Sequence, residues 1–234
     1  MNILALSTTS TSGSIAIYKA DHISYINHLD IKTTHSERLL PQIEAGLKNS
    51  KLDISEINLV TLANGPGSFT SIRIGLATAK GICLANEIPL EPINTLEMLA
   101  HNVIPTHRNI LTIIDAKMSE VYAALFTPEM QVLIAARNST PKQFLSMIDV
   151  PVIIVGDGGK LYKQEILDNG IDFLFCQEHQ NVPLASTLIS IVLEREIPEY
   201  DFNQISSLEP YYLRKSQAEL IRNEKIKKKR ENEK

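Results

Sequence analysis

Residues 63–75 read ANGPGSFTSIRIG, a glycine turn set between an apolar run and a helix-like stretch of small residues. Gly65 and Gly67 have access to backbone conformations that other residues avoid, and the proline between them restricts the turn. Ser68 or Thr70 can cap a helix whose free N–H groups face the loop. The arrangement suits a bound phosphate, and it equally suits a rigid corner from which a helix projects toward a partner.

The composition is that of a globular protein. The 234 residues are 44% hydrophobic and 21% charged, enough chain for one large domain or two small ones. Cys83 and Cys176 lie far apart and form no CxxC motif, so we expect free thiols in a reducing compartment. The opening apolar run at 3–6 is too short for a secretory signal, and no run approaches the roughly 20 residues of a membrane span. We therefore expect a cytoplasmic protein.

The charge is unevenly distributed along the chain. The net charge is −4, but residues 222–234 hold seven basic and three acidic residues, so this segment carries +4 and the remainder −8. An acidic body is a poor match for the phosphate backbone of a nucleic acid. We expect 222–234 to be a flexible basic tail, with contact to RNA as the alternative.

The same pattern of elements occurs twice. In the first half the sequence predicts strands at 3–7, 14–19 and 23–29, a helix at 36–48, a strand at 57–63, the glycine loop and a helix at 70–85. In the second half it predicts strands at 110–115, 121–126 and 132–136, a helix at 141–148, a strand at 151–155, a second glycine loop at 156–159 and a helix to 168. Each half is therefore a mixed sheet with helices for both faces, which suggests duplication.

Five strings of residues carry a resemblance to a known family. They are 2–8 (NILALST), 35–41 (HSERLLP), 65–75 (GPGSFTSIRIG), 114–122 (IDAKMSEVY) and 210–214 (PYYLR). Together they resemble the TsaB (YeaZ) family of tRNA threonylcarbamoyladenosine biosynthesis, within the superfold of actin, Hsp70 and sugar kinases. The resemblance implies an α/β fold of two tandem ribonuclease-H-like lobes, at 1–107 and 108–221, followed by the tail.

The resemblance also implies a non-catalytic role. TsaB-like proteins pair with a TsaD-like subunit, which transfers a threonylcarbamoyl group to adenine beside the tRNA anticodon, and a TsaE-like ATPase joins them. The family's pairing surface is a bundle of the two helices found here at 36–48 and 70–85, which forms a homodimer when TsaD is absent; tRNA is contacted only indirectly. The expected partner-binding residues are His35, Glu37, Leu39, Phe69, Ile72, Arg73, Leu76, Ala79, Lys80 and Cys83, with Gly75 and Ala79 spaced for close helix approach.

An enzyme that binds or hydrolyses ATP is the first alternative. Enzymes of this superfold place a carboxylate after the first strand to order Mg²⁺, because hard cations prefer oxygen ligands. Ser7 stands at that position here, where the TsaB pattern itself tends to have Asp. The candidate contacts for ATP or ADP are Ser7, Gly65, Gly67, Ser68 and Asp115. Because hydroxyls are weak, neutral metal ligands, we expect no cofactor of the isolated chain and no catalytic residue.

A metallopeptidase that acts on the TsaD-like partner is the second alternative. TsaD-like sequences carry His-x-Glu-x-His on the helix after the fifth strand. In this chain Thr95 and Leu99 occupy the histidine positions, and only Glu97 remains. His101 lies one helical turn after Glu97, so we expect a hydrogen bond between them. The other histidines lack metal-ligand spacing, and we expect no metal site.

Overall fold

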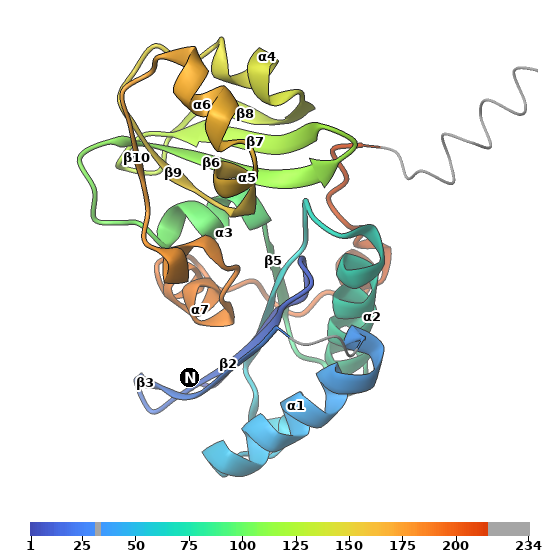
Figure 1. Cartoon of the computed structure of the whole chain (residues 1–234). Coiled ribbons are helices and arrows are strands. Elements are labelled where there is room, and N and C mark those ends of the chain that lie inside the picture. Colours follow the sequence, from blue (N-terminus) through green and yellow to red (C-terminus); the bar gives the residue numbers. More distant parts are fainter. Residues whose placement is uncertain (31–33, 215–234) are drawn as a thin grey trace, which may run out of the picture.

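The computed structural model describes residues 1–30 and 34–214, which form two lobes (Figure 1). Within these ranges the strands make two five-stranded mixed sheets. The first sheet has the order β3-β2-β1-β4-β5, and the second has the order β8-β7-β6-β9-β10. The order is the same when each lobe is counted from its own first strand, so the predicted repeat is present. The predicted basic tail at 222–234 lies outside the described residues.

The strands of the first sheet are β1 (Ile3–Ser7), β2 (Gly13–Lys19), β3 (His22–Leu29), β4 (Leu59–Ala63) and β5 (Leu90–Ile93). Those of the second sheet are β6 (Asn109–Lys117), β7 (Glu120–Phe126), β8 (Val132–Ser139), β9 (Val152–Val155) and β10 (Phe173–Phe175). In each lobe the first three strands pair antiparallel and the later pairs are parallel. The predicted α/β class with a mixed sheet in each half is confirmed.

The helices are α1 (His35–Ser50), α2 (Phe69–Asn86), α3 (Thr95–His101), α4 (Pro141–Leu145), α5 (Asp157–Leu161), α6 (Lys163–Asn169), α7 (Ala185–Leu193) and α8 (Phe202–Ser207), with short 3-10 turns at Ile54–Glu56 and Glu178–Asn181. Helix α1 begins at a capping box, in which the Glu37 carboxylate accepts the N–H of Thr34 at 3.2 Å. Among the described residues, no helix combines the length and apolar character needed to cross a bilayer.

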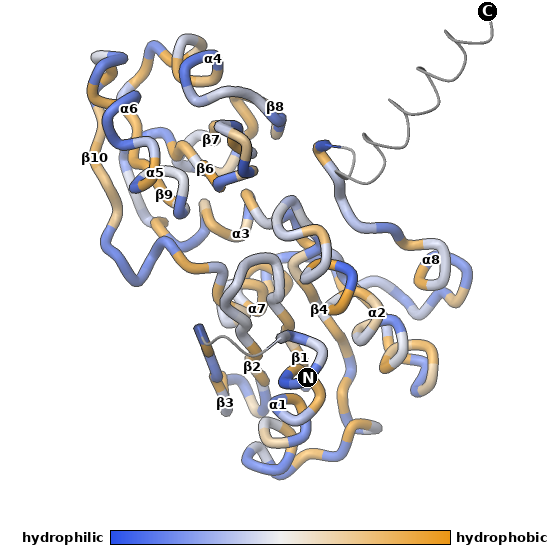
Figure 2. The backbone as a smooth tube through the Cα atoms, turned by 45° about the vertical axis from the view of Figure 1, so that its right-hand side comes forward, coloured by the Kyte–Doolittle hydropathy of each residue, from blue (hydrophilic) through white to orange (hydrophobic). Residues whose placement is uncertain are grey.

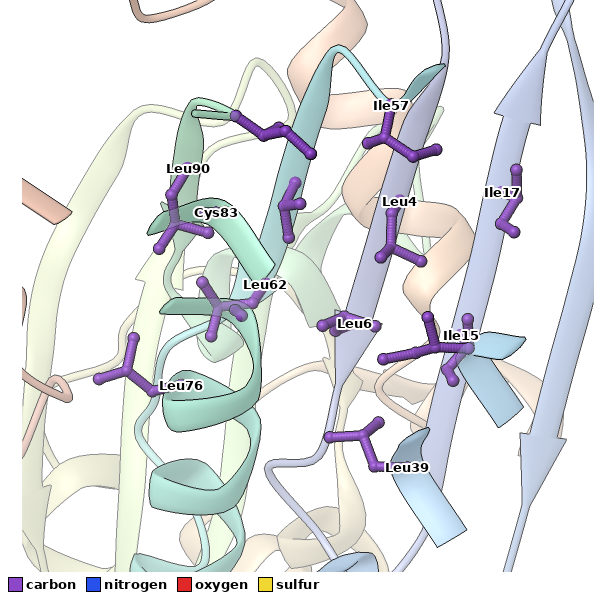
Figure 3. Close-up of a cluster of buried hydrophobic side chains, with 14 of the residues drawn as sticks. Leu4, Leu6, Ile15, Ile17, Leu39, Ile57, Leu62, Leu76, Cys83 and Leu90 are labelled. Atoms are coloured by element: carbon purple, nitrogen blue, oxygen red, sulfur yellow. The ribbon is translucent and has the colours of Figure 1, made fainter. Parts of the chain in front are cut away.

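The core of the first lobe has two faces because side chains alternate along the buried strand β1. Leu4 and Leu6 point toward α1 and α2, where they meet Leu39 and Leu76 (Figure 3). Ile3 and Ala5 point the other way, toward α7. Strands β1 and β4 are correspondingly hydrophobic along most of their length (Figure 2). Each leucine buried here stabilises the fold by about 1.5–3 kcal/mol.

Helix α3 lies between the lobes. It packs on the inner face of the second sheet, where Leu96 and Leu99 join the cluster around Tyr122, and it also contacts α7. Helices α4 and α6 cover the outer face of the second sheet through Phe144 and Ile166. The two sheets are therefore separated by α3 and α7, and the lobes meet there.

The path of the chain after β10 differs from the predicted division at 108–221. Helix α7 packs on β1, β2 and β4 of the first sheet, and α8 packs on α2 (Figure 1). Residues 185–193 read ASTLISIVL, and this apolar helix buries the sheet face that α1 and α2 leave open. The first lobe is thus completed by a late segment that the prediction had assigned to the second lobe.

Candidate functional site

The glycine loop after β4 is packed against other parts of its own chain. A Cβ atom on Gly67 would lie 2.2 Å from the carbonyl oxygen of Thr9, and one on Gly65 would lie 2.5 Å from that of Tyr211. The N–H of Ser68, the residue that precedes α2, donates to the Thr9 carbonyl at 2.8 Å. The loop is therefore a corner that fixes α2 beside the β1–β2 loop and the C-terminal segment, which is one of the two uses that the sequence left open.

A cleft of about 500 Å³ lies between the lobes next to this corner. Its first-lobe wall is rich in hydroxyl groups from residues 9–11 and 67–70, and its second-lobe wall comes from the β6–β7 turn, Asp157 and the end of the described chain. The hydroxyl of Thr9 is buried and has no hydrogen-bond partner among the described residues. Of the predicted cofactor contacts, Gly67, Ser68 and Asp115 line this cleft.

Ser7, the last residue of β1, and Asp115, two residues before the end of β6, lie in different environments. Ser7 is fully buried, and its hydroxyl finds no partner in the part of the chain that the structure describes. The Asp115 carboxylate lies 2.6 Å from the Lys117 ammonium and accepts the Lys117 N–H at 2.8 Å. The side-chain hydrogen bond to Asp115 is the main reason that the pKa of Lys117 is raised. The Asp115 carboxylate is therefore paired with the ammonium of its neighbour.

Asp157 also lines the cleft. It belongs to the second glycine loop at 156–159 but was not among the predicted contacts for ATP or ADP. Its carboxylate accepts the N–H of Asp115 at 3.0 Å, and desolvation is the largest cause of its raised pKa. Ser7 does not line the cleft, and the carboxylate of Asp115, which does, is paired with Lys117.

The helix that carries metal ligands in TsaD-like sequences is structural here. Thr95 and Leu99 are buried, and the carboxylate of Glu97 pairs with Arg195. The predicted hydrogen bond between His101 and Glu97 is present, and it joins the imidazole Nδ1 to the main-chain carbonyl of Glu97 at 3.0 Å. Within residues 1–30 and 34–214, no three His, Cys, Asp or Glu side chains come together as metal ligands could.

Most of the predicted partner-binding residues face inward, which corrects their assignment. The buried members are His35, Leu39, Ile72, Leu76, Ala79 and Cys83, all with 6% or less of their surface exposed. They occupy the inner faces of α1 and α2 because the wider apolar face of an amphipathic helix packs on the sheet. Gly75 also faces inward: a Cβ there would lie 2.2 Å from the Thr8 hydroxyl, which donates to the Ser71 carbonyl at 2.8 Å.

Three further members contact the chain's own C-terminal segment. The guanidinium of Arg73 lies 3.7 Å from the centroid of the Phe69 ring, and its Nε donates to the Tyr212 hydroxyl at 2.7 Å. Phe69 and Tyr212 stack with ring centroids 4.8 Å apart. Lys80 donates to the carbonyls of Ser206 and Leu208 at 2.8 and 2.7 Å. Within the predicted set, only Arg73 and Glu37 are exposed. The Glu37 side chain caps α1.

The outward face of α2 was not in the predicted set, although the small residues in the sequence are its signal. Residues 74–79 and 81–86 carry no charge. Apart from Arg73 and Lys80, which contact the C-terminal segment, the outward side carries small or apolar residues that are exposed or half-buried: Thr70, Ile74, Ala77, Thr78, Gly81, Ile82 and Ala85. Helix α1 packs beside α2 and adds Leu40, which is 59% exposed. We call these eight residues the α1–α2 face.

Comparisons with known proteins match this architecture. The family model described as TsaD, tRNA N6-adenosine threonylcarbamoyltransferase, matches residues 30–220. The tRNA threonylcarbamoyladenosine biosynthesis protein TsaB of Bacillus subtilis (strain 168) is 30% identical over 228 residues, which are 94% of this chain and 96% of that relative. The chain belongs to the TsaB family. The TsaB of Escherichia coli (strain K12) is 33% identical over 127 residues, 53% of this chain and 54% of its own length.

Solved structures show the same fold. YeaZ from Pseudomonas aeruginosa superimposes with a TM-score of 0.74 at 23% identity, covering 91% of this chain and 99% of that one. A second structure from the same organism, described as an uncharacterized protein with similarity to peptidase YEAZ, gives a TM-score of 0.75 at 22% identity over the same shares. The predicted resemblance to the TsaB (YeaZ) family is confirmed, and the TsaD match shows that the two families are related in sequence.

Proposed function

We propose that this chain is a non-catalytic subunit of tRNA N6-threonylcarbamoyladenosine biosynthesis that binds and activates a TsaD-like transferase through the α1–α2 face, with a TsaE-like ATPase joining the pair. The observation that carries the proposal is the uncharged outward side of α2 beside the exposed Leu40. The TsaB relatives are named for this biosynthesis, and the TsaD-like subunit is the related protein that carries out the transfer.

The α1–α2 face suits the docking of other helices. Small side chains at Ala77 and Gly81 let a second helix approach to the 8–10 Å axial distance of close packing. A Cβ atom added at Gly81 would meet nothing within 4 Å, so this side of α2 is open in the described structure. The centre of a protein interface is depleted of charge, as this surface is. Ile74, Ile82 and Leu40 supply apolar area that would be buried on binding.

The relation between the two families supports a paired geometry. The TsaD family model covers residues 30–220 and therefore spans both α1 and α2. A paralogue with the same two helices can place them against these in a pseudo-twofold arrangement, as symmetric dimers do. The same self-complementary surface would form a homodimer of this chain when no transferase is present.

Binding measurements with the purified TsaD-like subunit of the same organism test the proposal. In Gly81→Arg and Ala77→Arg, a long charged side chain would stand in the middle of the α1–α2 face. We expect titration calorimetry to show at least tenfold weaker binding for both variants, about 1.4 kcal/mol or more. Gln143→Arg, on the exposed side of α4 in the second lobe, is the matched control and should bind like the wild type. Wild-type affinity of both α2 variants would overturn the proposed surface.

For the isolated chain we propose neither a nucleotide cofactor nor catalysis. The buried Ser7 and the Asp115–Lys117 pair support this, since neither offers a free carboxylate to Mg²⁺. Titration of the chain with ATP and Mg²⁺ should give no heat of binding. Magnesium-dependent binding that Asp115→Ala abolishes would instead favour an ATP-binding enzyme, and cleavage of the purified transferase by this chain would favour a peptidase.

A further inference from the structure

The C-terminal strap, which we define as residues 209–214, runs from the first lobe to the second alongside α2 (Figure 1). At its first-lobe end it is held by main-chain contacts. The Asn64 side chain donates to the Glu209 carbonyl at 3.0 Å, and the Tyr211 N–H donates to the Asn64 carbonyl at 2.8 Å. Gly65 leaves room for the Tyr211 carbonyl. The strap is thus seated on the glycine corner that orients α2.

The middle of the strap is fixed by aromatic and cationic side chains. Tyr212 stacks on Phe69, and the Arg73 guanidinium lies over both rings, 3.7 Å from the centroid of Phe69 and 5.7 Å from that of Tyr212. Cation–π contacts and offset ring stacking are both attractive at partly exposed sites. These contacts tie the strap to the first turns of α2.

The far end of the strap is attached to the second lobe. Arg214 forms an ion pair with Glu120 at 2.6 Å and donates to the Ala116 carbonyl at 3.0 Å. Leu213 packs against the cluster that α3 shares with the second sheet. Glu120 also accepts a hydrogen bond from Asn138 at 2.9 Å, so the ion pair is anchored in the sheet. Six residues therefore join the two lobes.

The strap and the contact between α3 and α7 join the lobes at two separate places. Helices α3 and α7 meet between the sheets, whereas the strap passes beside α2 to the β6–β7 turn (Figure 1). Tyr212 and Arg214 both line the cleft. A hinge at one place needs a tether at another if the lobes are to keep one separation, because interfaces between domains otherwise permit relative motion.

We propose that the C-terminal strap is a clasp that sets the opening of the cleft and links it to α2. The contacts divide the clasp into two separable ends, Tyr212 on the first lobe and Arg214 on the second. Release of either end leaves the lobes joined at α3 and α7 and free to open about that contact. The inference goes beyond the proposed function, since it concerns this chain alone and needs no partner.

Distances between spin labels in the full chain test the clasp. Labels are placed at Lys48→Cys on α1 and Lys142→Cys on α4, both exposed positions, in a Cys176→Ser background. The remaining thiol, Cys83, is fully buried and does not need replacement. We expect Tyr212→Ala and Arg214→Ala each to shift the mean distance by more than about 2 Å, the scale of domain rearrangements, and to broaden the distribution.

Matched variants separate the clasp from general loss of stability. Arg108→Ala removes an ion pair of 2.9 Å with Asp172 inside the second lobe and should leave the distances unchanged. Circular dichroism checks that each variant is folded, and Glu120→Gln breaks the same ion pair from the other side if Arg214→Ala does not fold. The proposal would be overturned if the single variant Tyr212→Ala, and also the single variant Arg214→Ala or Glu120→Gln, gave the distance distribution of the wild type.

Discussion

The two lobes share a strand order but differ in the helix that follows the fourth strand. In the first lobe it is α2, one continuous helix of 18 residues with an open outward face. In the second lobe it is interrupted at Tyr162 between α5 and α6, and Gly158 and Gly159 bring it against Ile113 and Ile154. The shared topology therefore fixes the sheets, while the length and packing of one helix decide which lobe can offer a surface to a partner.

The largest effects should come from the two glycine corners, which hold equivalent places. Cβ atoms on Gly67 and Gly156 would lie 2.2 and 2.3 Å from carbonyl oxygens of Thr9 and Ile113. We expect Gly67→Val and Gly156→Val each to lower the free energy of unfolding by more than about 3 kcal/mol, or to prevent folding, as measured in urea. Gly81→Ala, in open space on α2, should be neutral or stabilising by up to about 1 kcal/mol. A tolerated change at only one corner would break the equivalence.

Ser7 at the end of β1 and Asp115 near the end of β6 give the next effect. An aspartate at position 7 would be fully buried without a described partner, whereas Asp115 has Lys117. We expect Ser7→Asp to cost about 3 kcal/mol or more in denaturant unfolding, because an unpaired charge is expensive to bury. Ser7→Ala removes a hydroxyl that has no hydrogen-bond partner among described residues and should change stability by less than about 1 kcal/mol. Equal stability of the Asp variant and the wild type would mean that Ser7 reaches solvent.

A smaller effect should appear in the pH dependence of stability, through His35 at the start of α1. Its Nε2 lies 2.8 Å from the Ser10 carbonyl and its Nδ1 lies 3.1 Å from Arg38. Burial first, and then the charge of Arg38, lower the pKa of His35, so the unfolded chain binds the proton more readily than the folded one. Stability should therefore fall as the pH drops below the ordinary histidine value of about 6.5, by at most about 1.4 kcal/mol per unit. Denaturant unfolding of the wild type and of His35→Gln across this pH range measures how much of the pH dependence of stability comes from His35. Parallel curves of stability against pH for the two proteins would refute the prediction.

The smallest effect concerns thiol reactivity in the two lobes. Burial raises the pKa of Cys83 in the first lobe to about 12 and that of Cys176 in the second to about 11. Cys176 is half-buried and Cys83 is fully buried. With a thiol reagent at neutral pH, we expect slow labelling of Cys176 and none of Cys83 until urea unfolds the chain. Labelling of Cys83 in the native protein would show that the inner face of α2 opens.

The elements with local signals could be predicted from the sequence. The helices predicted at 36–48 and 70–85 are α1 and α2 to within two residues at each end, because a capping box, a glycine corner and helical periodicity mark them. The place of residues 185–193 could not be predicted, since covering the first sheet is a long-range contact without a local pattern. The single helix predicted to reach 168 is two helices, because the backbone leaves the helical conformation at Tyr162.

The candidate site shows a second limit of sequence reasoning. The family resemblance assigned Leu39 on α1 and Ile72 on α2 to the partner-binding surface, but a helical sequence does not say whether such a residue faces the chain's own sheet or another protein. Both residues face the sheet. The roles of Tyr212 and Arg214 also depend on contacts with residues more than 90 positions away, which the sequence does not reveal.

Hydrogen exchange of the chain with and without its TsaD-like partner tests most directly whether the first lobe is the docking lobe. The account predicts slower exchange in α1 and α2 on complex formation, with α5 and α6 unchanged. Slower exchange confined to α5, α6 or β8, with α1 and α2 unaffected, would contradict it.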